Sequence, residues 1–329
     1  MQQDCRHGRQ QGGCNLLDRT LPEPTAAVDE PLTPISVSGV YWIELAPVLV
    51  AARDFYPQPL TVGDGGITRI TSGEADLATN AETQLLRESV TNSDLRIIMT
   101  VTEGFFRIVG RRSAGIETPA DLKGKTIMLP RKTSANYFLV AMLETVGLTE
   151  DDVNIIGLAK EKDGQGGMAQ MSGYLARGEV DAISIWEPEP VNAIEQLGDD
   201  AILFQDRDLY REVFNLHARA QDLADPEKRR SIVAYVRAVA EASEALKEEP
   251  TRYWDHISDI SGFSLHEIEQ SWPELEFPVQ IIPDMLDVLE REDVWVAKEL
   301  HRAPRSREEL AKLIDRSVLA EALGGHNDR

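Results

Sequence analysis

The sequence predicts an α/β protein of two lobes, built on mixed, mostly parallel sheets flanked by helices, with a helical C-terminal part. Short β-prone runs alternate with helical stretches up to about residue 218, an order typical of mostly parallel sheets. The pattern Gly-Glu-Ala-Asp-Leu-Ala at 73–78 returns as Gly-Glu-Val-Asp-Ala-Ile at 178–183, which indicates that one βαβ device is used once in each lobe. Beyond the strand-like run 213–216 the pattern is almost wholly helical.

The expected elements follow the chain in order. Residues 1–34 contain Pro22, Pro24, Pro31 and Pro34 and read as an extended tail. Gly73 and Gly178 each follow a helical stretch, as left-handed C-caps do. We expect strands at 35–40, 60–62, 95–101, 105–109 and 213–216, a turn that enters a buried strand at 122–129, and a strand after each of these glycines. We expect helices at 45–53, 136–146, 226–247, 265–272, 283–298 and 307–322.

Charge limits the partners. The chain carries 56 acidic and 34 basic residues, a net charge of −22. Nucleic acids and anionic membrane surfaces need clustered lysine and arginine, so neither is an expected partner. No run of 18 apolar residues predicts a membrane-spanning helix.

The first 17 residues are polar and lack the apolar core of a secretory signal. Either the protein is cytoplasmic or this chain lacks its export segment; the second, an exported protein that is periplasmic or lipid-anchored outside the cytoplasm, is implied only by the family resemblance given below. Cys5 and Cys14 are the only cysteines. A small-loop disulfide, a lipid-anchored cysteine and two unpaired thiols all remain open for them.

Ligands of open α/β sheets bind beyond the carboxyl ends of strands, which nominates the residues after Val40, Ala78, Leu129 and Ile185. The third place is the most informative, because Thr133 and Ser134 are good N-caps for the helix that follows. Free N–H groups and the helix dipole there suit an anion. We therefore expect Ser134 and Asn136 to hold an acidic group of a ligand; a simple helix cap is the alternative.

Aromatic residues mark two other strand ends. Tyr41 and Trp42 follow the first strand, and Trp186 follows the strand of the second lobe. Aromatics in place of a polar loop suggest a wall for an apolar or planar part of a ligand, with packing in the core as the alternative for Trp186. Four glutamates are further candidates for the pocket, with a place on the solvated surface as the alternative for each: Glu44, Glu82, Glu103 and Glu187.

Catalytic and metal-binding motifs are not found in the sequence. It contains no GxSxG, P-loop, GxGxxG, CxxC or HExxH pattern, so no cofactor, no metal and no catalysis are expected. His217, in the strand-like Asn-Leu-His at 215–217, is the only histidine that the pattern places near a crevice. We expect a structural role for it.

Several segments together resemble one known family. They are the stretch Thr-Pro-Ala-Asp-Leu-Lys-Gly-Lys at 118–125, Thr-Ser-Ala at 133–135, Ala-Arg-Gly-Glu-Val-Asp-Ala at 176–182, Trp-Glu-Pro at 186–188, Gly-Glu-Ala-Asp at 73–76 and the C-terminal 314–320. In this order and spacing they resemble the periplasmic solute-binding proteins that serve importers of aliphatic sulfonates, taurine, nitrate and thiamine-precursor pyrimidines. The resemblance spans about 35–323. Two departures are a shortened segment at 56–59 and the missing signal peptide.

The resemblance implies a type II periplasmic binding protein fold, in which the chain crosses twice between lobes. Lobe 1 would contain 35–109 and 214–329, and lobe 2 would contain 110–213, with hinges near Val109 and Val213. Carried over by position, the pocket would contain these residues: Tyr41, Trp42, Glu44, Asn80, Glu82, Ser134, Asn136, Trp186 and Glu187.

The function implied is that of a monomeric solute-binding subunit of an ABC importer, which closes on a small molecule and delivers it to a permease in the inner membrane. Carboxylates beside an anion site favour an amino-sulfonate, an amine-bearing acid or a nitrogen heterocycle over a simple inorganic anion. Two other classes stay open. One is an enzyme on the same scaffold, such as fungal thiamine-pyrimidine synthases, whose cysteine cluster is absent here, or menaquinone-pathway proteins. The other is a ligand-sensing domain.

Overall fold

The computed structural model describes residues 31–158 and 167–324. Cys5, Cys14 and nearly all of the expected extended tail lie outside the described residues. All elements below belong to one compact unit, residues 33–329. No helix in the described part of the chain is both long and apolar enough to cross a membrane.

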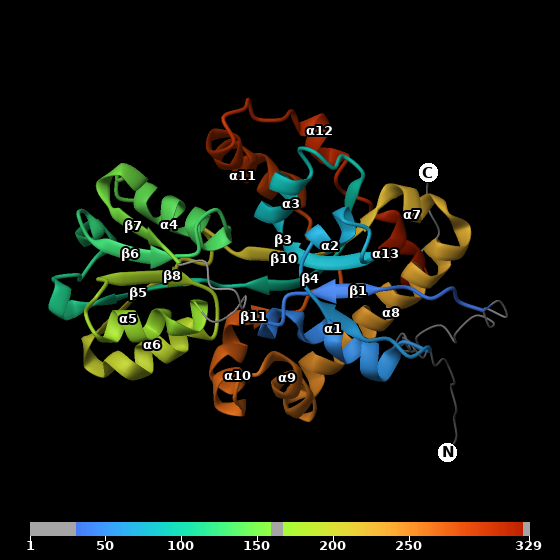
Figure 1. Ribbon diagram of the computed structural model, residues 1–329, viewed down its shortest axis with the longest axis horizontal. Helices are drawn as coiled ribbons and strands as arrows, with labels where there is room; N and C mark the ends of the chain where they lie inside the picture. The colour runs from blue at the N-terminus through green and yellow to red at the C-terminus, as the bar shows by residue number, and fades with distance from the viewer. Residues whose placement is uncertain (1–30, 159–166, 325–329) are drawn as a thin grey trace, which may run out of the picture. The chain divides into compact units, whose positions relative to one another are not determined.

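The described strands form two sheets (Figure 1). The first has six strands in the order β11-β4-β10-β3-β1-β2, and the second has five in the order β7-β6-β8-β5-β9. The strands of the first sheet are β1 Val37–Gly39, β2 Val62–Asp64, β3 Leu77–Ala81, β4 Leu95–Gly104, β10 Glu212–Arg219 and β11 Leu275–Glu276. Those of the second are β5 Arg107–Arg111, β6 Thr126–Leu129, β7 Asn154–Gly157, β8 Ala182–Ile185 and β9 Ala201–Phe204.

Both sheets are mixed, as expected, but parallel pairing does not predominate in the described strands. β1 pairs in parallel with β2 and β3, and β6 pairs in parallel with β7 and β8. β10 runs antiparallel to β3 and β4, β11 to β4, and β5 to β8 and β9. The expectation of mostly parallel sheets is wrong because β5 and β10, the strands that enter each sheet from the other, run against their neighbours.

Helices pack on both sheets. In Figure 1, α4 lies on one face of the second sheet and α5 and α6 lie on the other. The helices are α1 Ala46–Val50, α2 Thr68–Thr71, α3 Glu82–Glu88, α4 Ser134–Glu144, α5 Met171–Ala176, α6 Glu189–Leu197, α7 Ala220–Ala224, α8 Pro226–Glu248, α9 Trp254–Ser261, α10 Leu265–Ser271, α11 Met285–Glu299, α12 Arg307–Ala311 and α13 Ser317–Ala322. The helical C-terminal part is confirmed. The single helix expected at 307–322 is two, because Ile314 forms a β-bridge to Ile97 between α12 and α13.

The chain passes between the sheets twice. It leaves the first sheet after Gly104, enters the second at Arg107, and returns between Phe204 and Glu212. Val109 and Val213, near which the hinges are expected, lie inside β5 and β10, within a few residues of these crossings; the hinge positions and the lobe boundaries remain predictions.

A close approach at the end of β1 shapes the turn that follows it. A Cβ atom at Gly39 would lie 2.3 Å from Leu45 Cδ1 and 2.8 Å from the Thr79 hydroxyl oxygen. Glycine therefore lets the 3₁₀ turn Ile43–Leu45 fold back against the strand. This turn positions Trp42 and Glu44.

Asp293 fixes the C-terminal end of α11. Its fully buried carboxylate accepts hydrogen bonds from Arg302 Nη1 at 2.9 Å, Arg305 Nη2 at 2.8 Å and the Arg305 backbone N–H at 2.7 Å. Arg305 also donates to the Ser89 hydroxyl and the Leu86 carbonyl. The cluster thus ties the loop after α11 to the segment at the end of α3.

Replacing Asp293 with Ala should lower the free energy of unfolding by about 3 kcal/mol, because two half-buried guanidinium groups lose their counter-charge. Urea denaturation measures the change. The control is Asp287→Ala, whose carboxylate pairs with Arg307 at the exposed surface and should cost less than about 1 kcal/mol. Equal losses for the two variants would contradict the role assigned to Asp293.

Candidate functional site

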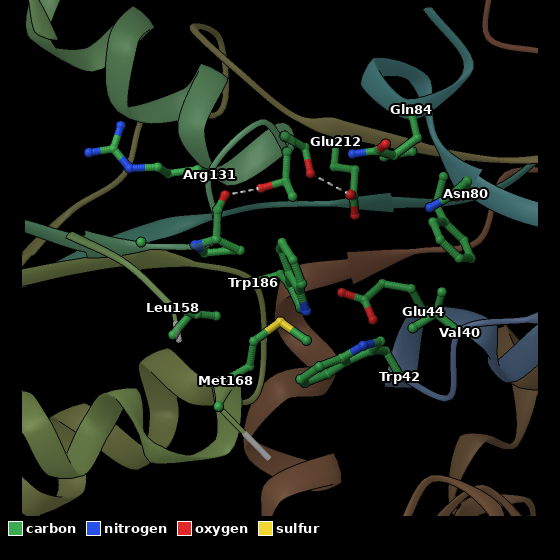
Figure 2. A pocket seen from close by; sticks show the side chains of 17 residues that line it. Val40, Trp42, Glu44, Asn80, Gln84, Arg131, Leu158, Met168, Trp186 and Glu212 are labelled. Carbon is green, nitrogen blue, oxygen red and sulfur yellow. Dashed lines mark hydrogen bonds between the residues drawn. The ribbon is translucent and has the colours of Figure 1, made fainter. Parts of the chain in front are cut away.

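A cavity of about 530 Å³ lies between the two sheets (Figure 2). Residues from the end of β1, from β3, α3 and β10 line it from the first sheet. The β6–α4 connection and the ends of β7 and β8 line it from the second. This volume falls within the range of small-molecule sites.

Five of the nine residues expected in the pocket line this cavity: Trp42, Glu44, Asn80, Ser134 and Trp186. Trp42 and Glu44 follow β1, and Asn80 lies near the end of β3. Ser134 begins α4 after β6, and Trp186 follows β8. β1 and β3 pair in parallel in the first sheet, and β6 and β8 pair in parallel in the second. The carboxyl ends of each pair therefore share one edge of their own sheet, which is why the strand-end rule finds these residues.

Tyr41 and Asn136 do not line the cavity, against expectation. The Tyr41 hydroxyl donates to the Val62 carbonyl at 2.7 Å. Asn136 Oδ1 accepts from the Lys132 N–H at 3.2 Å, and its Nδ2 donates to Glu150 at 2.8 Å. The Tyr41 hydroxyl thus joins the segment after β1 to β2, and the Asn136 amide joins the start of α4 to Glu150.

Glu82 and Glu187 also lie outside the lining. Glu82, fully buried, accepts from the Tyr210 hydroxyl at 2.9 Å and from the Val213 N–H at 2.8 Å. Glu187 forms an ion pair with Arg107 at 2.5 Å. Burial raises the pKa of Glu187 to about 7, and Arg107 opposes this rise. Each carboxyl group therefore has a partner inside the protein, although Oε2 of Glu187 has none among the described residues.

Glu212 lines the cavity and was not expected there. Its Oε1 accepts a hydrogen bond from Ser134 Oγ at 2.9 Å, one of the dashed lines in Figure 2. The strand-end rule misses Glu212 because it starts a strand. Since β10 runs antiparallel to β3, the amino end of β10 lies at the same edge as the carboxyl end of β3. Phe214 enters the lining for the same reason.

Glu44 and Glu212 face the cavity, and neither forms an ion pair with any described residue. Glu44 is 3 % exposed, and its Oε2 has no hydrogen-bond partner among the described residues. Burial, with a contribution from Glu187, raises the pKa of Glu44 to about 8. Burial, then the nearby Glu44 and Glu82, raise the pKa of Glu212 well above its usual range. The cavity therefore holds two carboxyl groups that favour their protonated form.

Two more buried carboxyl groups, those of Glu82 and Glu292, lie near Glu212. Glu82 lies on α3 and Glu292 on α11, and both are fully buried. Burial and then Glu82 raise the pKa of Glu292 well above its usual range. Three glutamates from three elements thus share one apolar region of the first sheet's half of the molecule.

Tryptophans from both sheets form the apolar wall. The rings of Trp42 and Trp186 meet edge to face, with centroids 5.7 Å apart. Figure 2 shows the thioether of Met168 beside them. The ring of Trp42 also packs against the ring of Phe263, with centroids 5.1 Å apart. An aromatic surface of this kind suits a planar or apolar ligand part.

Arg131 is the single basic residue among the described residues of the lining. Its Nη2 donates to the Ile155 carbonyl. In Figure 2 the guanidinium points away from Glu44 and Glu212, so Arg131 contributes its aliphatic stem to the wall.

His217 is fully buried in β10, with Nδ1 at 3.3 Å from the Ala78 carbonyl oxygen, and it does not line the cavity. Burial lowers the pKa of His217 to about 4. The residues described include no group of three or more His, Cys, Asp or Glu arranged to hold a metal ion.

Comparison with known families gives one match. The family model described as NMT1/THI5 like matches residues 62–253, more than half of the 329 residues. This range includes β3, α4 and β10, and with them most of the cavity lining.

Solved structures share the fold. The alkanesulfonate-binding protein SsuA from Xanthomonas axonopodis pv. citri, bound to MOPS, is 18% identical with a TM-score of 0.63, over 86% of this chain and 98% of that one. The periplasmic aliphatic sulphonate-binding protein SsuA from Escherichia coli is 16% identical with a TM-score of 0.69, over 84% and 97%. The desulfurization enzyme DszB is 16% identical with a TM-score of 0.64, over 88% and 99%. The expected two-sheet α/β architecture of periplasmic binding proteins is thereby confirmed.

The raised pKa of Glu44 predicts a pH-dependent stability. The folded protein keeps a proton on Glu44 that the unfolded chain loses above about pH 4.5. The free energy of unfolding is therefore highest, as far as Glu44 is concerned, below about pH 4.5, and it falls as the pH rises to about 8. Relative to wild type, Glu44→Gln should gain roughly 2–4 kcal/mol between pH 5 and pH 8. Urea denaturation at several pH values measures the difference.

The control is Glu269→Gln, an exposed carboxyl on α10, whose difference from wild type should stay constant over the same range. A Glu44→Gln difference that is equally constant would mean that Glu44 is ionised in the folded protein at pH 5.

Proposed function

This chain belongs to the NMT1/THI5-like family, and from that premise we propose that it is the solute-binding subunit of an ABC importer. It captures a small organic molecule in the cavity between the two sheets and delivers it to a permease in the inner membrane. It works as a monomer outside the cytoplasm. The observation that carries this proposal is the cavity itself, which both sheets line with two tryptophans and two buried carboxyl groups.

An enzyme on the same scaffold is the rival function, since DszB shares the fold. Among the described residues, the cavity lining includes no histidine, cysteine or lysine, and both cysteines of the chain lie outside the described residues. Nucleophilic catalysis needs an activated nucleophile beside a base. The lining favours binding over catalysis on this ground.

The lining also favours a class of ligand. Buried carboxyl groups without a cation gain most from a ligand that brings hydrogen-bond donors or a positive charge. Glu44 lies against Trp42 and Trp186 in Figure 2, so a ring stacked on the tryptophans presents its nitrogen to this carboxyl, with a cation–π contribution where the nitrogen is charged. The ligands proposed are an amino-sulfonate, an amine-bearing acid or a nitrogen heterocycle.

A thermal-shift panel that pairs amino compounds with their des-amino analogues tests the ligand class. The amino members should raise the Tm more than their partners. Calorimetric titration of the best amino compound should then show a loss of about tenfold to a hundredfold in affinity for Glu44→Gln, the value of a hydrogen bond to a charged group. Glu269→Gln serves as control and should bind as wild type does. Larger shifts with the des-amino anions would refute the proposed ligand class.

We also propose that binding closes the two halves of the molecule on the ligand. Trp42–Trp186 and Ser134–Glu212 join residues of the two sheets across the cavity. Small-angle scattering should show a smaller radius of gyration with the best amino compound of the panel than without it. An unchanged radius at saturating ligand would argue against closure.

A further inference from the structure

The amino end of α4 already has an acceptor. Ser134 is the first residue of this 11-residue helix, and its hydroxyl donates to Glu212 at 2.9 Å. The two residues are only 2 % and 5 % exposed. They come from the two different sheets, Ser134 from the β6–α4 connection and Glu212 from the start of β10. A carboxyl of the protein itself therefore lies where an acidic group of a ligand was expected.

An acidic ligand group would meet three obstacles in this place. It would have to displace the Glu212 oxygen from the Ser134 hydroxyl. It would also lie beside Glu212 and Glu44, where a negative charge on either carboxyl group would repel an anion strongly because the site is desolvated. Arg131 offers no compensating charge at this point, because its guanidinium is directed to the Ile155 carbonyl.

We propose that Glu212 determines specificity by occupying the anion position at the start of α4, and so excludes sulfonates, carboxylates and other small oxoanions from the cavity. This inference rests on the proposed binding function and narrows its ligand. Of the three ligand classes above, it excludes the amino-sulfonate and the amine-bearing acid and leaves the nitrogen heterocycle without an acidic group.

Occupancy does not depend on the charge of Glu212. A carboxylate accepts the Ser134 hydrogen bond, and so does the carbonyl oxygen of a protonated carboxyl. The charged or titratable groups that act on Glu212 are Glu44 and Glu82, which favour its proton, while the Ser134 hydroxyl favours its ionised form. The position is filled in both states.

Two variants separate occupancy from charge. Glu212→Ala removes the acceptor and frees the Ser134 hydroxyl, whereas Glu212→Gln keeps an oxygen at the same place without a charge. The probe is methanesulfonate, with neutral methanesulfonamide as its matched control, and isothermal titration calorimetry measures binding. Removing Glu212 also takes away a buried carboxyl group that forms no ion pair with a described residue, so the fold should be retained; thermal melting checks this.

Wild type and Glu212→Gln should not bind methanesulfonate measurably. Glu212→Ala should bind it at least about tenfold more tightly, and more tightly than methanesulfonamide, because two or more donors then face the anion. Adding Ser134→Ala to Glu212→Ala should abolish the gain. If Glu212→Ala does not fold, Glu212→Thr, with a shorter side chain, carries the same expectation.

Wild type that binds methanesulfonate as tightly as Glu212→Ala does would overturn the inference and leave the proposed binding function intact. A folded Glu212→Ala that gains no affinity would overturn it as well. Gain in Glu212→Gln equal to that in Glu212→Ala would show that charge alone excludes the anion, and occupancy would be rejected.

Discussion

The direction of β10 is the constraint on which the rest of the site depends. This strand returns from the second sheet and enters the first between β3 and β4, antiparallel to both. Its amino end therefore reaches the edge at which the parallel strands end. Through this one reversal Glu212 and Phe214 join a cavity whose other lining residues lie mostly at or shortly after the carboxyl ends of strands. The same strand places Val213 where its N–H can satisfy the buried Glu82.

The sequence predicts those parts of the molecule that local patterns determine. Strand ends locate Trp42, Ser134 and Trp186, because the hydrophobic pattern marks where each strand stops. It does not show strand direction, so Glu212 is missed and a parallel majority is expected. Partners far apart along the chain are equally hidden. Glu187 pairs with Arg107, 80 residues away, and no spacing rule predicts that such a carboxyl turns from the cavity.

Uncompensated acidity is the unusual physical property of the site. Glu44, Glu82, Glu212 and Glu292 are buried, yet no described arginine or lysine forms an ion pair with any of them. Isolated buried charges are costly, and such groups normally become neutral. The cost is acceptable where function requires it, since perturbed carboxyl groups gather at sites that bind or react. Glu82 lies deepest and is satisfied by a tyrosine hydroxyl and a backbone N–H, whereas Glu44, at the cavity wall, keeps an oxygen without a partner.

The crossing at Phe105 and Phe106 has a mechanical consequence. Two chain segments that join the same two sheets leave rotation about the line through both segments as their least constrained relative motion. Phe106 is not a free pivot, because its ring packs against Phe138, Tyr210 and Trp186, with centroids 5.6–6.3 Å apart. Bending at this crossing must slide these rings over one another. The aromatic cluster at this crossing therefore includes Trp186, a residue of the cavity wall.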